Sequence, residues 1–135
     1  MNVAELDELI KLAEIECSRR SVIAPLPRAA VERLRSGEEL SPMDFCDSFA
    51  RRVAHEYAEN NLSFSTADAA MNALHVYVSN EFDVRLPSYA WEVFLAFDEG
   101  EYRHAGDPEG IDPEQKYTRP AISSIVVRDQ ILRSK

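Results

Sequence analysis

Two adjacent residues in the middle of the chain have side chains that occur in zinc sites. His55 and Glu56 begin like the zinc motif H-E-x-x-H, in which two histidines one helical turn apart bind the metal. Four residues after His55, however, the sequence has Glu59, so the second imidazole is missing. We therefore expect His55 and Glu59 to form a solvated pair one turn apart on a helix, without a metal.

A second pattern with the right residue types for chemistry is the carboxylate series Asp107, Glu109 and Asp112. An EF-hand calcium loop needs oxygen ligands at positions 1, 3 and 5 and glycine at position 6. Counted from Asp107, Gly110 falls at position 4 and Ile111 at position 5, so the register fails. No dedicated calcium site is expected, and the sequence predicts no cofactor.

The three histidines are too scattered to predict catalysis. We expect His75, at the edge of an apolar stripe, to be partly buried and hydrogen-bonded. His104 lies among acids that favour its protonated form, which makes it an interface candidate. No nucleophile is placed beside any histidine, and no phosphate-binding loop, dinucleotide fingerprint or nucleophile elbow is present. The chain is therefore predicted not to be an enzyme.

Charge is distributed unevenly along the sequence. The net charge is −9 with a pI near 4.8, and residues 92–114 alone carry −7. The segments 19–35 and 115–135 each carry +4. Such an acidic chain disfavours nucleic acid or an anionic membrane as a partner. The acidic cluster is either a solvated surface or a site for a basic partner.

Composition places the chain among cytoplasmic globular proteins. The 135 residues form one predicted domain, residues 1–135, with 45% hydrophobic residues. No run approaches the ~20 apolar residues of a membrane span, and residues 1–16 are too acidic for a secretory signal. Cys17 and Cys46 lie on apolar helical stripes and are read as buried thiols of a reducing cytosol, with one disulfide as the less favoured alternative.

Hydrophobic periodicity predicts the elements that must position these groups. The pattern indicates an all-α fold, a single compact bundle of five or six helices with one long acidic loop. Ser41 and Ser65 are the N-cap candidates, each with Asp three residues later. The predicted helices cover residues 3–18, 27–36, 42–60, 66–80, 87–99 and 120–132, and the loop covers residues 98–119.

The centre of the predicted bundle is the aromatic segment after Pro87. Trp91, Phe94 and Phe97 are expected to form the core round which the other helices pack. Short apolar runs are ambiguous by periodicity, so a strand remains the alternative for residues 91–97 and for residues 121–127. Helix is favoured for residues 91–97, because no partner strand is evident.

The strings AFDEGEY (96–102) and KYTRPAI (116–122), together with Trp91, resemble bacterial immunity proteins of the contact-dependent growth inhibition or polymorphic toxin type. The resemblance covers about a quarter of the chain. It implies a cytosolic, non-enzymatic protein that binds one cognate toxin domain and blocks it. Basic nucleases are among such toxins, and carboxylates can occupy a cleft built for phosphates.

The expected partner is thus a cognate toxin domain. The residues predicted to bind it share an acidic or aromatic character and a position on or beside the long loop. They are Asp98, Glu99, Glu101, Tyr102, His104, Asp107, Glu109 and Asp112. The alternatives are a small helical adaptor and a metal-binding protein without a toxin partner.

Overall fold

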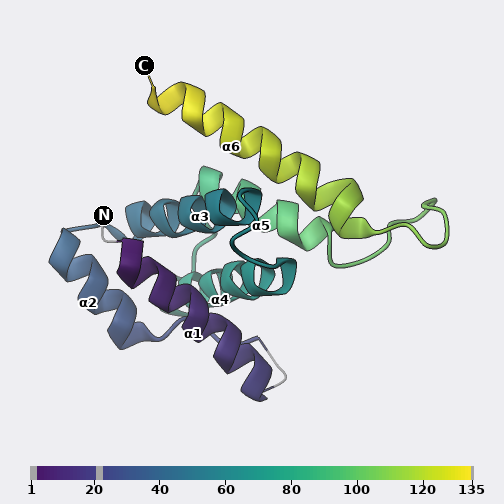
Figure 1. Cartoon of the computed structure of the whole chain (residues 1–135). Coiled ribbons are helices and arrows are strands. Elements are labelled where there is room, and N and C mark those ends of the chain that lie inside the picture. Colours follow the sequence, from purple (N-terminus) through teal and green to yellow (C-terminus); the bar gives the residue numbers. More distant parts are fainter. Residues whose placement is uncertain (1–2, 21–22, 135) are drawn as a thin grey trace.

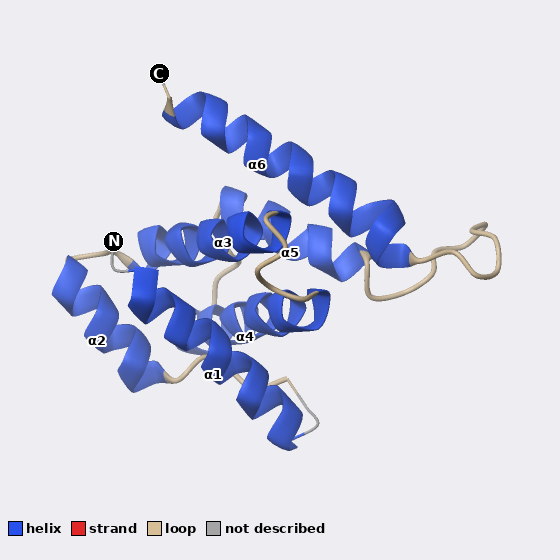
Figure 2. Cartoon of the chain, viewed as in Figure 1, coloured by secondary structure: helices blue, strands red, loops and turns tan. Residues whose placement is uncertain are grey.

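The computed structural model of the chain describes residues 3–20 and 23–134. Within these residues the protein contains six α-helices, one π-helical turn and no strand (Figures 1 and 2). The helices are α1 (Val3–Arg20), α2 (Arg28–Glu38), α3 (Pro42–Ala58), α4 (Phe64–Phe82), α5 (Ser88–Glu99) and α6 (Arg119–Arg133). The all-α prediction is confirmed, and residues 91–97 and 121–127 are helical.

The helices α3, α4 and α5 pack on one another and form the centre of the bundle. Helix α1 lies against α4 and α3, and α2 contacts α1 at the edge. Helix α6 packs along α3 and α5, with its C-terminal end beyond the other helices (Figure 1). None of the helices in the described ranges is both long and apolar enough to cross a bilayer.

The local start signals were predicted correctly for α3 and two residues too late for α4. The hydroxyl of Ser41 accepts a hydrogen bond from the backbone N–H of Asp44 at 3.1 Å, as an N-cap does. Helix α4 is capped by Ser63 instead of Ser65, with Thr66 as the donor at 3.2 Å. The earlier start places Phe64 in the first turn, where its ring packs 6.1 Å from that of Phe97.

The core is centred on Phe97, and the predicted roles of Trp91 and Phe94 were wrong. Phe97 is fully buried and meets the Tyr57 ring edge-on at 5.0 Å. Trp91 and Phe94 are only partly buried and stack on each other at 5.4 Å. The spacing within α5 explains this, because Ala90, Val93 and Phe97 form the inner face at i, i+3 and i+7.

The long loop is shorter than predicted. The loop covers residues 100–112, and a π-helical turn (Glu114–Thr118) then runs directly into α6. Long-range contacts hold this turn, since the Tyr57 hydroxyl donates to the Glu114 carboxylate at 2.5 Å. Pro120 lies in the first turn of α6, as expected. One arm of the loop extends away from the helices (Figure 1), whereas its start contacts α4 and α5.

Both cysteines are free thiols. Cys46 is buried in α3, and Cys17 is partly buried in α1. Burial raises the pKa of the Cys46 thiol to about 12, and the nearby charge of Asp47 adds to the effect. Cys46 therefore stays protonated and acts as a small apolar core residue.

Candidate functional site

The eight predicted partner-binding residues lie at one end of the bundle. Asp98 and Glu99 form the last turn of α5, and the other six lie in the loop between residues 100 and 112. Their side chains have different environments, however. Some hold the loop together, and others face water.

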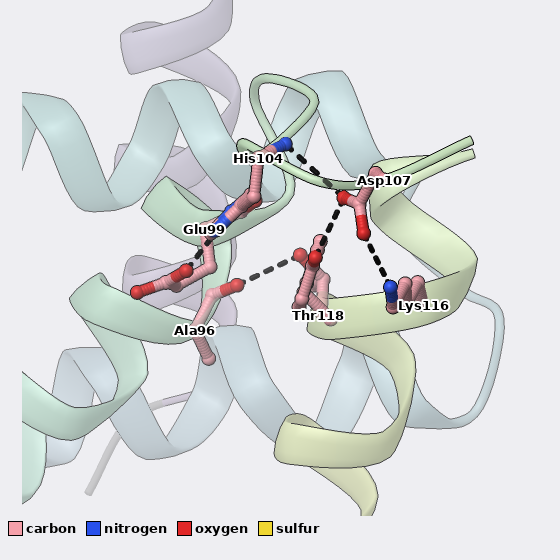
Figure 3. Close-up of polar contacts among 7 residues, drawn as sticks. Ala96, Glu99, His104, Asp107, Lys116 and Thr118 are labelled. Carbon is pink, nitrogen blue, oxygen red and sulfur yellow. Dashed lines mark hydrogen bonds and ion pairs between the residues drawn. The ribbon is translucent and has the colours of Figure 1, made fainter. Parts of the chain in front are cut away.

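Asp107 connects the loop to the π-helical turn. Its carboxylate accepts hydrogen bonds from the Tyr117 hydroxyl at 2.6 Å and from the backbone N–H of His104 at 3.1 Å, and it pairs with Lys116 (Figure 3). Only 4% of this side chain is exposed. The hydrogen bonds from Lys116 and Tyr117 lower the pKa of Asp107 to about 2. Asp107 therefore braces the loop and is not available at its surface.

His104 fills the interior of the loop. Its ring stacks between those of Tyr102, at a centroid distance of 4.6 Å, and Tyr117, at 4.0 Å. The Nε2 atom lies 3.0 Å from the carboxylate of Glu99 and 2.9 Å from the carbonyl oxygen of the same residue (Figure 3). The predicted acidic neighbourhood of His104 is confirmed. The stack leaves Tyr102 as its outer member, with 51% of that residue exposed.

Asp68, which the sequence pattern assigned to the N-terminal cap of α4, lies instead beneath the start of the loop. Asp68, on α4, has its pKa raised by burial first, then by a hydrogen bond with Glu101 and by the charges of Glu101 and Asp98. Asn72, one turn later on α4, donates to Glu101 at 3.1 Å. No local pattern predicts this cluster, because Asp68 and Glu101 are brought together only by the packing of α4 on α5.

The exposed acids of the loop are Glu101, Glu109 and Asp112, and of these Glu101 is bound to Asp68 and Asn72 on α4. Glu109 lies at the tip, between Gly106 and Gly110, whose φ angles of +88° and +83° let the chain turn there. Asp112 is exposed but also accepts a hydrogen bond from the backbone N–H of Glu114 at 3.0 Å, at the start of the π-helical turn. The exposed charge of the loop therefore lies at its tip and at its two ends.

His55 is not paired with Glu59 as predicted. Its Nε2 atom lies 3.0 Å from the carboxylate of Asp129 on α6, which also accepts from Arg51 Nε at 3.0 Å. Burial favours a higher pKa for Asp129, but the hydrogen bonds from His55 and Arg51 outweigh it and lower the pKa. Ser48 precedes His55 by seven residues on α3, about 10 Å along the helix, so these groups do not form a Ser-His-Asp triad.

Throughout residues 3–20 and 23–134, no three His, Cys, Asp or Glu side chains are arranged to hold a metal ion.

Comparison of the chain with protein-family models, curated proteins and solved structures finds no match. The acidic loop is thus the candidate site on its own geometry: an exposed acidic tip on a base fixed by buried hydrogen bonds and stacked rings.

Proposed function

We propose that this protein is a stoichiometric inhibitor that binds a cognate toxin domain through its acidic loop. The observation that carries the proposal is the contrast between the exposed and the braced carboxylates of the loop. Glu109, at the tip, and Asp112, at the end of the loop, are exposed, whereas Asp107 is tied to Lys116 and Tyr117. A loop that only keeps a protein in solution does not need such bracing.

Bracing matters for binding because a flexible loop must lose conformational entropy when it docks. Each immobilised side chain costs roughly 0.5–1.5 kcal/mol on association. The His104 stack and the hydrogen bonds of Asp107 already hold these side chains in the free protein, so part of this conformational entropy is lost during folding and not on binding. The exposed ring of Tyr102 then offers a rigid aromatic surface next to the acids, which is the kind of anchor found at interface hot spots.

The sign of the charge selects the partner. Residues 92–114 carry −7, of which the loop residues 100–112 carry −3, so this end of the protein attracts a basic surface and repels nucleic acid. A nuclease toxin has such a surface where it holds phosphates. Carboxylates at the tip of the loop can occupy that surface and exclude the substrate. The resemblance of residues 96–102 and 116–122 to immunity proteins supports the same partner class.

The test is coexpression with a toxin domain encoded beside this gene. We expect the protein to restore growth and to form a one-to-one complex on gel filtration. In a double variant, Glu109→Gln with Asp112→Asn, we expect weaker protection while the fold is retained. Its matched control is Glu8→Gln with Glu39→Gln, which removes the same charge from exposed positions on α1 and after α2. Failure of the wild-type protein to bind or protect would overturn the proposal.

A further inference from the structure

A second surface with functional potential lies at the opposite end of α6 from the acidic loop. A groove of about 720 Å³ runs between the start of α1, the middle of α3 and the last turns of α6. This volume is within the range of ligand sites in proteins. None of the loop residues lines this groove, so it is a surface separate from the acidic loop.

The groove is rich in cationic side chains although the protein is strongly acidic. Arg51, Arg52 and Arg133 line it together with His55, and Asp129 is the one carboxylate among the lining residues. Asp129 is nearly buried, with 7% of its side chain exposed, and contacts Arg51 and His55. The lining residues therefore carry a formal charge of +2 with His55 neutral, opposite in sign to the net charge of −9. Outside the lining, Asp7 and Glu56 pair with Arg52.

The arginines of the groove differ in how many of their hydrogen-bonding groups are occupied within the protein. Arg52 binds the Asp7 carboxylate with two hydrogen bonds of 2.8 and 3.0 Å. Arg51 donates to Asp129 only through Nε, and its guanidinium lies 4.8 Å from the centre of the Tyr89 ring. Arg133 has an exposed side chain, and no residue in the described part of the chain pairs with it.

We propose that this groove binds an acidic peptide segment of a protein partner. A carboxylate can bind the terminal nitrogens of Arg51 and the guanidinium of Arg133, in the bidentate geometry that arginine favours. Ser48 and Gln130 also line the groove and offer hydrogen bonds to a peptide backbone. Val3, which is 49% exposed, provides an apolar surface for an aliphatic side chain between two acids.

The charge distribution favours a short peptide over a nucleic acid. Screening at ~0.15 M salt limits electrostatic interactions to about 8 Å, so a short segment responds mainly to the groove itself. A long polyanion extends past the groove and meets the rest of a protein with a net charge of −9. The protein as a whole also repels an anionic peptide. Binding of such a peptide must therefore come from contacts in the groove and not from the overall charge.

The experiment is an NMR titration of the full chain with a capped Glu-Leu-Glu peptide, and with Gln-Leu-Gln as the uncharged control. We expect saturable shifts of backbone amides from Ser48 to His55 and from Asp129 to Ser134 with the acidic peptide only. In the variant Arg133→Glu the affinity should fall at least tenfold. The variant Arg103→Glu makes the same charge change at an exposed loop position, and its affinity for the acidic peptide should stay within twofold of the wild-type value.

Three results would overturn the inference. The first is the absence of shifts in these segments with the acidic peptide. The second is equal binding by Arg133→Glu protein that retains its fold. The third comes from a parallel titration with inorganic phosphate. If phosphate shifts the same amides with equal or higher affinity, the groove is a general anion site and not a peptide site.

Discussion

The hydroxyl of Thr118 donates a hydrogen bond of 2.7 Å to the carbonyl oxygen of Ala96, so the turn before α6 is fixed to the end of α5. Thr118 is completely buried. Gly100, which ends α5, lies directly against the Thr118 side chain, and a Cβ atom there would overlap Oγ1. This contact closes the base of the acidic loop, because residues 100 and 118 flank the loop and its π-helical turn.

Gly100→Ala should therefore destabilise the protein. The added methyl group must displace Thr118 or the backbone, and overpacking of this kind typically costs about 1–3 kcal/mol. Urea denaturation followed by circular dichroism measures the change. Gly37→Ala is the matched control, since nothing lies within 4 Å of the position in α2, and it should be neutral or stabilising by up to about 1 kcal/mol. Equal stability of the Gly100→Ala and wild-type proteins would show that Thr118 moves freely.

Phe97→Ala should destabilise the fold more than Trp91→Ala, although tryptophan is the larger residue. Phe97 is fully buried between Tyr57 and Phe64, and loss of such a ring costs about 3–5 kcal/mol. The Trp91 ring is partly exposed and loses less buried area, so its removal should cost at least about 1 kcal/mol less. Urea denaturation of both variants, followed by circular dichroism, gives the order. The reverse order would place the centre of the core at Trp91.

The acidic loop should loosen on acidification because of Asp107. The pKa of Asp107 is lowered to about 2 by hydrogen bonds from Lys116 and Tyr117, so the ionised carboxylate stabilises the folded loop. This stabilisation is complete above the ordinary pKa of aspartate, near 4, and is lost as the pH falls through about 2. NMR signals of the His104 and Tyr117 amides should therefore change between pH 4 and pH 2.

The variant Asp107→Asn provides the control for that titration. It removes the carboxylate at every pH, so its loop amides should already differ from wild type at pH 7 and change little on acidification. Amides in α3 and α4 report any general acid unfolding. Identical acid titrations of the loop in the wild type and in Asp107→Asn would contradict the assigned role of Asp107.

Under the proposed function, the exposed charges of Glu109 and Asp112 should act on the rate of toxin association. Exposed charges steer encounter and are screened by salt, so Glu109→Gln with Asp112→Asn should slow association and flatten its salt dependence. Asp107 is left unchanged, because its replacement would disturb the loop. Rates measured at two salt concentrations test this, with Glu8→Gln and Glu39→Gln as the control pair. If the association rates and their salt dependence are unchanged, the toxin interface lies elsewhere on the protein.

Tyr102→Ala should act on dissociation instead. The Tyr102 ring is held by the His104 stack and is exposed on its outer side, so it can form apolar contact that breaks only when the complex separates. A faster dissociation rate with an unchanged salt slope is expected. Tyr102→Phe keeps the stacked ring and should bind as the wild type does. A loss of binding in Tyr102→Phe as well would assign the effect to the hydroxyl and not to the ring.

Helix content and several helix ends were predictable, because they depend on short-range physics. Apolar residues repeat at i, i+3 and i+4 within each helix, and the Ser41 cap needs only the backbone three residues later. The net charge of residues 92–114 is likewise a property of the sequence alone. These features need no knowledge of which helices touch.

The tertiary structure alone decided how the charged residues are used. Asp107 and Glu109 are two residues apart in the sequence, yet one braces the loop and the other faces water, because the π-helical turn brings Lys116 and Tyr117 to Asp107. His55 meets Asp129 across 74 residues, a distance at which spacing carries no information. The sequence predicted an acidic loop at the end of an aromatic helix, whereas the packing of α4, α5 and α6 determined which of its carboxylates a partner can reach.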